Sequence, residues 1–407
     1  MAVIAIVVDT EQGHIISSFS LAKKLLARGH RVCYLGLAVV ENMVLKQGFE
    51  FRRIMDGLLS SSDLIQLRPP DGNEADTRIV GKFWGLLMRG AGVDGPLLEL
   101  SPDVILMTSL YYFEALVLRY RYNVPVIVIN STDVCECRKQ VGRTVVDSMV
   151  SMPGAAALID LLLSAKVEIR NFADVAALIL QMPELRLQPK VFELPGASQD
   201  PLVFYVGPEV DLDRVDEPYD WSRLQTDRPL IYCSLGSQLD LRGEVSRRLV
   251  RTVIEAAAQR PDWQFVISLG ARLSATEFEP IPSSVILNHW VPQLQMLARA
   301  SVMITHAGIG SVKECILHGV PMLALPLMRD QFDTADRIVY HRLGFRGDIE
   351  RIGAEDLASM LDQLIINESF RERVRVMREE FQRAEAQNLG VTLIEKVIAG
   401  CLPVDSH

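Results

Sequence analysis

Several features that would assign this 407-residue chain to a membrane or to nucleic acid are missing from its sequence. No apolar stretch approaches the roughly 20 residues that a membrane-spanning helix needs. The apolar start, MAVIAIVV, is shorter than the apolar region of a secretory signal, and Asp9 follows it directly. Basic runs are lacking, and the formal net charge of -9 opposes binding to nucleic-acid phosphates. We expect no transmembrane segment and no nucleic-acid partner, while GAAALIDLLLSA at residues 154–165 leaves a peripheral membrane contact open.

The cysteine pattern excludes two further kinds of protein. The six cysteines are scattered along the chain at Cys33, Cys135, Cys137, Cys233, Cys315 and Cys401. Their spacing forms neither a disulfide framework nor a zinc-binding pattern. Such a chain is typical of a reducing compartment, so we expect a cytoplasmic protein.

What the sequence does contain is an alternation of short apolar runs and amphipathic segments. Residues 3–8 are predicted to form a strand, residues 15–28 a helix that ends at Gly29, and residues 31–37 the next strand. The pattern continues through DVILMT, YYFEALVLRYR and VPVIVIN, which predicts an α/β fold with a parallel sheet covered by helices. We expect two interruptions, residues 60–95 and 133–188, to wall a pocket beyond the carboxyl ends of the strands.

The length of the chain and a break in this pattern predict two domains. The segment at 208–226 combines prolines and acidic residues with few apolar ones, as interdomain linkers do. After it, PLIYCSLGS, WQFVIS, SVILNHW, SVMITH and VPMLALP are predicted strands. We therefore predict a Rossmann-like domain over residues 1–207, a linker over 208–226, a second Rossmann-like domain over 227–385, and a C-terminal helix over 386–407 that packs back on the first domain.

The stretch SVMITHAGIGSVKECILHGVPMLALP, residues 301–326, breaks from an apolar strand into glycines and a serine beside a histidine. It predicts a strand, a glycine-containing turn and a helix that ends at Gly319. Unpaired backbone amides and the positive end of the helix dipole would then face out of the sheet, where they suit a phosphate. The alternative is that Ser311 and Glu314 form a capping box that satisfies the helix's own donors.

Two common phosphate-binding signatures do not fit this stretch. Gly308 and Gly310 begin a dinucleotide fingerprint, but Lys313 stands where its third small residue belongs and would hinder close packing of helix on strand. No G-x-x-x-x-G-K-[ST] loop occurs in the chain either. The sequence thus predicts a phosphate site without a standard NAD or ATP signature.

Together with its surroundings, this stretch resembles the nucleotide-sugar signature of family 1 glycosyltransferases. The resemblance rests on HWVPQLQML, HAGIGSVKE, HGVPMLALP and RDQ, and is supported by GHIISSFSLAKKLLARGHRV near the start and YCSLGS after the linker. The chain is similar in particular to bacterial enzymes that glycosylate macrolides and other natural products. The resemblance implies the GT-B fold, in which two Rossmann-like domains face each other across a cleft and the C-terminal helix crosses back to the first domain.

The resemblance also implies a set of donor-binding residues in the second domain: Ser237, Trp290, Gln293, His306, Gly308, Gly310, Ser311, Glu314, Asp330 and Gln331. Within this set, Trp290 would stack on or flank the base of the nucleotide, with Gln293 nearby. Glu314 would bind the ribose hydroxyls, because a carboxylate suits paired hydroxyls. The alternatives are that Trp290 belongs to the core and that Glu314 is only a capping partner.

The diphosphate and the sugar would contact the remaining members of this set. The amides after Gly308 and three side chains would hold the diphosphate, namely Ser237, His306 and Ser311. Imidazole, hydroxyl and amide donors suit phosphate oxygens. Asp330 and Gln331 would hydrogen-bond the sugar, and the alternative for Asp330 is that it only caps the helix that follows it.

His14 is the candidate catalytic base. Transfer of a sugar to a hydroxyl needs a base for the acceptor proton. His14 follows the first predicted strand and precedes the first helix, which places it at the rim of the expected pocket, near a helix N-terminus that disfavours imidazolium. Position alone would favour a surface histidine in a turn, so the assignment rests on the resemblance.

One departure from the family pattern concerns the partner of this histidine. In many relatives an aspartate after a later strand orients it, but here PDVILMTSLYYFEA has Thr108 or Ser109 at that place. Such a carboxylate would stabilise imidazolium in the transition state. Three carboxylates are left as substitutes, Asp9, Glu11 and Glu114, unless the histidine acts alone.

We predict no metal and no cofactor, with the UDP-sugar as a co-substrate. Asp211-x-Asp213 resembles the D-x-D motif that holds a manganese diphosphate in other glycosyltransferases. No strand precedes it, so we expect a solvated linker there. A helix N-terminus and His306 can neutralise the leaving diphosphate without a cation.

The predicted reaction is metal-independent, inverting transfer of a hexose, glucose from UDP-glucose, to a hydroxyl of an apolar small molecule such as a polyketide, macrolide or phenolic metabolite. UDP-N-acetylglucosamine and dTDP-deoxysugars are left open as donors. Candidate acceptor-binding residues are Phe83, Trp84, Met88 and Ser109. Two other functions also remain open: a non-catalytic helper protein that resembles a glycosyltransferase, and a nucleotide-sugar epimerase on the GT-B scaffold.

Overall fold

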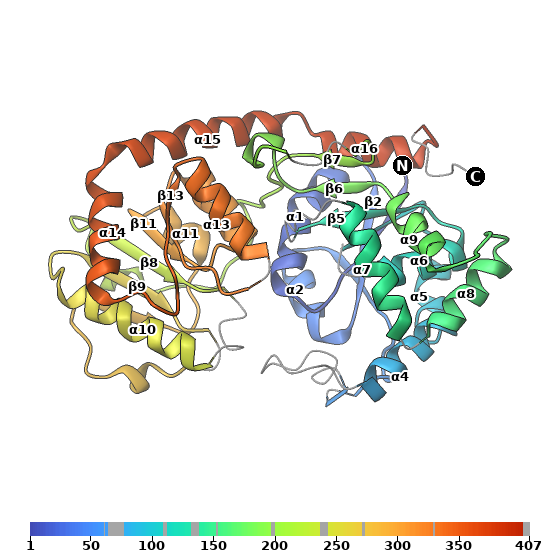
Figure 1. The fold of residues 1–407 in the computed structure, drawn as a ribbon, viewed down its shortest axis with the longest axis horizontal. Coiled ribbons are helices and arrows are strands. Elements are labelled where there is room, and N and C mark those ends of the chain that lie inside the picture. Colours follow the sequence, from blue (N-terminus) through green and yellow to red (C-terminus); the bar gives the residue numbers. More distant parts are fainter. Residues whose placement is uncertain are drawn as a thin grey trace.

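The computed structural model describes residues 1–60, 62–63, 77–108, 112–131, 138–151, 154–196, 200–236, 243–270, 273–328 and 330–401. Two parallel sheets, each covered by helices, form two α/β domains that lie side by side (Figure 1). This architecture confirms the predicted fold class.

The first domain is built on a seven-stranded sheet in the order β3-β2-β1-β4-β5-β6-β7. Its strands are β1 (Val3–Val7), β2 (Arg31–Gly36), β3 (Glu50–Arg53), β4 (Val104–Thr108), β5 (Val126–Asn130), β6 (Glu184–Arg186) and β7 (Val203–Tyr205). The helices are α1 (Gln12–Ala27), α2 (Glu41–Lys46), α4 (Thr77–Met88), α5 (Asp94–Leu100), α6 (Tyr112–Tyr122), α7 (Arg138–Ser151), α8 (Ala155–Ser164) and α9 (Phe172–Leu180). The central strands β4 and β5 are buried along their whole length because helices cover both faces of the sheet.

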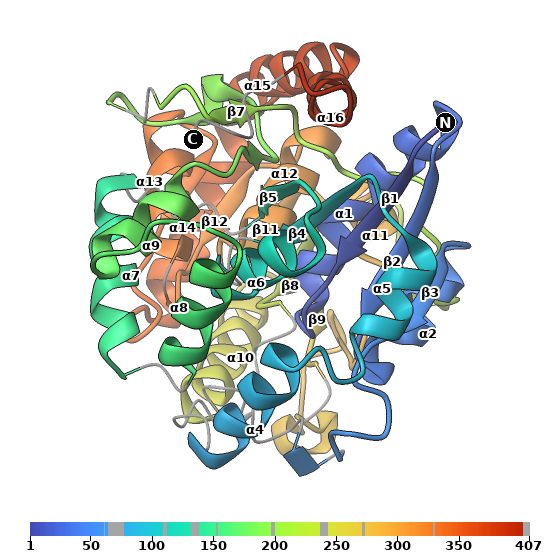
Figure 2. The ribbon, with the colours of Figure 1, turned by 90° about the vertical axis from the view of Figure 1, so that its right-hand side faces the viewer.

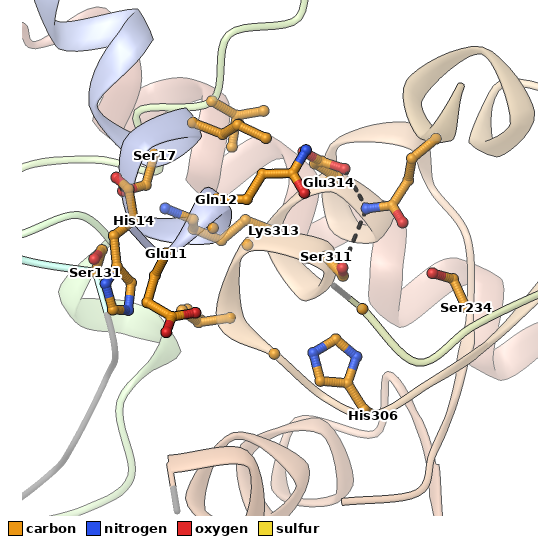
Figure 3. Close-up of a pocket in the computed structure, with 18 of the residues that line it drawn as sticks. Glu11, Gln12, His14, Ser17, Ser131, Ser234, His306, Ser311, Lys313 and Glu314 are labelled. Carbon is orange, nitrogen blue, oxygen red and sulfur yellow. Dashed lines mark hydrogen bonds between the residues drawn. The ribbon is translucent and has the colours of Figure 1, made fainter. Parts of the chain in front are cut away.

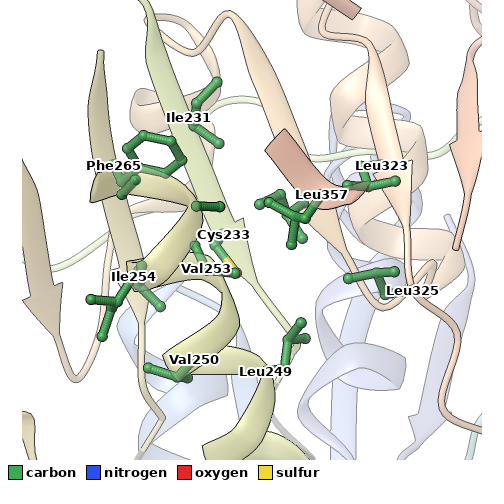
Figure 4. Close-up of a cluster of buried hydrophobic side chains, with 14 of the residues drawn as sticks. Ile231, Cys233, Leu249, Val250, Val253, Ile254, Phe265, Leu323, Leu325 and Leu357 are labelled. Atoms are coloured by element: carbon green, nitrogen blue, oxygen red, sulfur yellow. The ribbon is translucent and has the colours of Figure 1, made fainter. Parts of the chain in front are cut away.

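The second domain has a six-stranded sheet in the order β10-β9-β8-β11-β12-β13. Its strands are β8 (Leu230–Ser234), β9 (Gln264–Ser268), β10 (Val285–Asn288), β11 (Val302–Thr305), β12 (Met322–Ala324) and β13 (Gly344–Arg346). The helices are α10 (Gly243–Ala258), α11 (Gln293–Leu297), α12 (Ile309–His318), α13 (Asp330–Tyr340) and α14 (Ala354–Ile366). On one face Ile231 and Cys233 of β8 pack with Val253 of α10, so the sheet and the helix share a core (Figure 4).

Each sheet has one place where the chain reverses its direction of winding. In the first sheet this switch point lies between β1 and β4, and in the second between β8 and β11. At such a point the loops leaving the two strands diverge and open a crevice beyond their carboxyl ends. Asp9 and Thr108 lie at the first crevice, and Ser234 and His306 at the second.

The C-terminal segment joins the two domains. The long helix α15 (Glu368–Ala386) runs from the second domain across to the first, where α16 (Leu389–Ile398) lies against α1 (Figures 1 and 2). Ile394 and Val397 of α16 are buried in the same cluster as Leu21 of α1. Arg28 donates to Glu395 at 3.1 Å and adds a polar contact at the edge of this interface.

The two interruptions of the first domain are mainly helical. They contain α4 and α5, and α7 to α9, in the described residues. In α8, Leu158 and Leu162 are fully buried, so the apolar stretch at 154–165 packs against the first domain while Leu163 is half exposed. Among the described residues, no helix combines the length and the apolar character that crossing a membrane requires.

Candidate active site

A cavity of about 350 Å³ lies where the crevices of the two sheets meet. His14 and Glu11 line it from the first domain, and His306 and Ser311 from the second (Figure 3). Arg214 lines it from the segment that connects the two sheets. The cavity therefore contains the candidate base together with much of the expected donor-binding set.

His14 is held by a carboxylate of the segment that follows β1. Its Nδ1 lies 2.6 Å from Oδ2 of Asp9, whose side chain is fully buried, whereas the His14 side chain is 14% exposed. The helix α1 begins at Gln12, three residues earlier than predicted, which puts His14 in its first turn. The imidazole is thus reachable from the cavity while its partner is shielded from solvent.

The Asp9 carboxylate is itself fixed from two other directions. Its Oδ1 accepts a hydrogen bond from the backbone amide of Glu11 at 2.6 Å, and its Oδ2 accepts one from Thr108 Oγ1 at 3.2 Å. Of the three carboxylates left open by the sequence, Asp9 is the one that pairs with His14. Thr108, one of the two residues expected at the place of the family aspartate, supplies a hydroxyl to it.

His306 lies at the second crevice, partly buried between two glycines. A Cβ at Gly308 would lie 2.4 Å from the His306 Nε2, and one at Gly236 would lie 2.6 Å from its Cε1. Burial lowers the pKa of His306 to about 4, so the ring is neutral near pH 7. Within the described part of the chain, its Nδ1 is buried without a hydrogen-bond partner.

The helix α12 begins directly beside this histidine. Its N-cap is Gly308, which offers no side-chain cap, so the alternative that Ser311 and Glu314 form a capping box is wrong. Ser311 lies inside the first turn and accepts a hydrogen bond from Gln293 Nε2 at 3.1 Å. The first amides of the helix therefore have no side-chain cap at the edge of the cavity, as an anion site requires.

Glu314 is the centre of a polar cluster in the cavity wall. Gln293 donates to its Oε2 at 2.6 Å, and Arg214 pairs with both of its oxygens. Tyr232 donates to the Oε1 of Gln293 at 3.4 Å. Sequence reasoning missed Arg214, because it lies in a segment whose composition indicated only a linker.

Trp290 and the first residues of α13 complete the lining from the second domain. Trp290 is 52% exposed, so the alternative that it belongs to the core is wrong. Asp330 and Gln331 begin α13, and Gln331 Oε1 accepts hydrogen bonds from the amides of Leu327 and Met328. Gly310 also lines the cavity.

The three acceptor-binding candidates among the described residues do not line this cavity. Trp84 is buried and packs edge-on against Phe113, while Phe83 and Met88 pack against the same core of the first domain. An amphipathic helix has to bury its apolar face, and α4 buries it against the sheet domain and not at the cavity. Ser109 and the donor candidate Ser237 lie outside the described residues.

The segment that carries Asp211-x-Asp213 is not uniformly solvated. Asp213 is exposed as expected, but Asp211 is buried and pairs with Lys23 of α1 at 2.6 Å, which corrects the prediction for that residue. In the described ranges, no group of three or more potential metal-ligating His, Cys, Asp or Glu side chains occurs. Asp211 therefore attaches the connecting segment to α1 of the first domain, whereas Asp213 remains exposed.

Comparisons with known proteins agree with this arrangement. The model of the family described as UDP-glucoronosyl and UDP-glucosyl transferase matches residues 218–382. The demethyllactenocin mycarosyltransferase of Streptomyces fradiae is 27% identical over 98% of this chain and 87% of its own length. The NDP-glycosyltransferase YjiC of Bacillus subtilis is 25% identical over 94% of both chains.

A solved structure extends the agreement to the whole fold. The crystal structure of the glycotransferase of kitacinnamycin superposes with a TM-score of 0.76 at 26% identity, covering 97% of this chain and 98% of the other. Sequence, fold and cavity thus all lead to the same group of proteins. The chain has the GT-B fold and resembles the family 1 glycosyltransferases, in particular the bacterial natural-product glycosyltransferases among them.

Proposed function

We propose that the protein transfers glucose from UDP-glucose, with inversion, to a hydroxyl of an apolar small molecule. The observation that carries this proposal is that the His14–Asp9 pair and the donor-type residues His306, Ser311 and Glu314 line one cavity. A base and a nucleotide-sugar site on opposite walls are what direct transfer to a hydroxyl requires.

His14 would act as the general base. With Asp9 ionised, His14 Nδ1 carries a proton and donates it to Asp9 Oδ2, which leaves Nε2 as the acceptor atom. Nε2 takes the proton of the acceptor hydroxyl as that oxygen forms a bond to the anomeric carbon. Asp9 stabilises the resulting imidazolium and keeps the ring oriented.

The second domain would stabilise the leaving group. As the new bond forms, the bond from the anomeric carbon to the diphosphate breaks and its electron pair stays on the phosphate oxygen. The N-terminus of α12, the Ser311 hydroxyl and the neutral His306 ring supply donors for that charge. Because the displacement is direct, the anomeric configuration inverts.

These protein donors make a metal unnecessary in the proposed mechanism. A helix N-terminus binds phosphate through backbone amides and the helix dipole alone. We propose that no cofactor takes part and that the nucleotide sugar is a co-substrate only.

The donor and acceptor assignments rest on separate observations. For the donor, the description of the matching family names UDP-sugar transfer. The side-chain carbonyl of Gln331 accepts hydrogen bonds from two loop amides, which leaves its Nε2 to donate to a sugar hydroxyl. For the acceptor, the relatives named for demethyllactenocin and kitacinnamycin suggest a polyketide-like or other natural product. A dTDP-sugar donor is the main variant of this proposal.

The test is a turnover assay by mass spectrometry without added metal. UDP-glucose, UDP-N-acetylglucosamine and a dTDP-deoxysugar are each incubated with a panel of macrocyclic and phenolic acceptors, and the anomeric configuration of the product is read by NMR. An acceptor heavier by one hexose, with inverted configuration, is the expected result. Retention of configuration would overturn the mechanism, and product from the dTDP-sugar alone would overturn the donor assignment.

The same assay without acceptor examines the two other functions. Interconversion of UDP-N-acetylglucosamine with an epimer would indicate the epimerase. If the protein binds no nucleotide sugar and forms no product with any donor, the result would indicate the helper protein. Either result would contradict the proposed transferase.

A further inference from the structure

The Glu314 carboxylate is engaged by protein donors on both oxygens. Gln293 Nε2 donates to Oε2 at 2.6 Å, and the Arg214 guanidinium reaches Oε1 through Nη1 and Oε2 through Nη2, the latter at 3.4 Å. The side chains of Arg214 and Glu314 are 9% and 6% exposed. A buried, two-pronged pair of this kind restricts the orientation of the carboxylate plane.

Arg214 comes from a segment that is attached to the first domain. Next to it, Val215 exchanges two hydrogen bonds with Gln47, one from its amide to Oε1 and one from Nε2 to its carbonyl, each at 3.0 Å. Lys46 pairs with Glu217. Both partners lie at the end of α2, so the backbone around Arg214 follows the position of the first domain.

Glu314, in contrast, belongs to α12 of the second domain. The Arg214–Glu314 pair therefore connects a segment fixed on the acceptor side to a carboxylate on the donor side. Its place in the cavity wall is beside Gln293 and Ser311, where the resemblance to family 1 glycosyltransferases implies the nucleoside part of a donor.

We propose that Arg214 is a positioning residue for nucleoside recognition, which holds the Glu314 carboxylate in the orientation that accepts hydrogen bonds from the ribose hydroxyls. The inference rests on the proposed function, because it requires a nucleotide donor in this cavity. Each carboxylate oxygen offers about two lone-pair sites, so the protein donors leave acceptor capacity for hydroxyls. Ribose recognition then depends on the linker as well as on the second domain.

The chemistry of the ligand provides a selective test. Isothermal titration measures the affinities of wild type and Arg214→Met for UDP, for 2′,3′-dideoxy-UDP and for inorganic pyrophosphate. In wild type, loss of the ribose hydroxyls should weaken binding about tenfold, which corresponds to about 1.4 kcal/mol. In Arg214→Met, UDP should bind about tenfold more weakly, whereas the dideoxy analogue and pyrophosphate should bind within about twofold of wild type.

Two further variants separate positioning from general effects of charge or folding. Arg214→Lys should recover part of the UDP affinity, because an ammonium keeps the charge but cannot bond both oxygens in a fork. Arg247→Met removes the same charge from an exposed pair with Glu277, and should change none of the three affinities. Thermal unfolding of all variants checks that the fold persists.

The outcomes distinguish the inference from the proposed function. Equal weakening of all three ligands by Arg214→Met, or no weakening of UDP, would overturn the role of Arg214 while leaving the transferase intact. If wild type binds neither UDP nor pyrophosphate, the donor site itself is wrong, and both proposals fall.

Discussion

The Nδ1 atom of His14 lies 2.6 Å from Oδ2 of Asp9, a carboxylate that comes from the end of β1 and not from the end of β4. Thr108, at the end of β4, donates its hydroxyl to the same oxygen at 3.2 Å. Because β1 and β4 are neighbours in the sheet, a carboxylate after either strand can reach the first turn of α1. The protein thus has a histidine–carboxylate pair whose carboxylate follows β1.

Asp9→Asn should lower kcat by roughly 10²- to 10⁴-fold. The amide occupies the same space but lacks the charge that stabilises imidazolium, and it can favour the wrong tautomer of His14. Steady-state kinetics with saturating donor measures the effect. UDP affinity by titration should stay at the wild-type value, since Asp9 lies in the first domain, and an unchanged kcat would show that the pair has no catalytic role.

Moving the carboxylate to the other strand should restore part of this loss. In Asp9→Asn with Thr108→Asp, the carboxylate comes from β4, and we expect about tenfold of the lost kcat to return. The matched control is Asp9→Asn with Thr108→Asn, which has the same shape without the charge and should recover nothing. Equal rates in the two double variants would show that a carboxylate at position 108 cannot replace the one at position 9.

The two glycines at the start of α12 should respond in opposite ways to alanine. At Gly308 a Cβ would lie 2.4 Å from His306 Nε2, so the imidazole must move, and Gly308→Ala should cost about 1–3 kcal/mol of unfolding free energy and weaken UDP binding. At Gly310 no heavy atom lies within 4 Å, and Gly310→Ala should raise stability by up to about 1 kcal/mol. Urea denaturation measures the free energy of unfolding of both variants. Similar decreases in the two variants would contradict the close packing of His306 against Gly308.

Stability should fall in acid because of His306. Burial lowers its pKa from 6.5 to about 4, so between these values the unfolded chain binds the proton and the folded chain does not. The free energy of unfolding therefore decreases as the pH falls from 6.5 towards 4, by up to about 3 kcal/mol from this group. Urea denaturation of wild type and His306→Asn across this range should show a shallower pH dependence in the variant; parallel curves would contradict a neutral, buried ring.

Removal of divalent metal should leave turnover unchanged. The leaving diphosphate is expected to meet the amides of α12, Ser311 and His306, which need no cation. Initial rates are compared in EDTA and after addition of manganese or magnesium. Complete loss of product in EDTA that manganese restores would refute the metal-independent mechanism.

Much of the fold follows from local patterns in the sequence. The apolar runs that became β1, β4, β8 and β11 are buried on both sides, and their order along the chain predicts parallel sheets. The break in the apolar pattern after β11 correctly predicted the strand, the turn and the helix around His306. The start of α1 was predicted too late because Gly13, a poor helix former, lies inside its first turn.

The parts of the site that the sequence left open depend on contacts between distant segments. Asp9 is distinguished from Glu11 and Glu114 by the path of the chain between β1 and α1, and Thr108 reaches it only because β1 and β4 are adjacent. Arg214 has no signal of its own, since an arginine in an acidic linker is ordinary until the linker is placed beside α12. The apolar residues of α4 show the opposite case. Trp84 is a large apolar residue of the kind that lines binding pockets, but it packs in the core of the first domain.

The most direct test of the central claim is a paired measurement on His14→Ala. Product formation from UDP-glucose and a competent acceptor is followed by mass spectrometry, and UDP affinity is measured on the same preparation. We predict that transfer is lost by at least about 10²-fold while UDP binds as it does to wild type. Wild-type turnover in His14→Ala would contradict the role of His14, because the base would then lie elsewhere in the cavity.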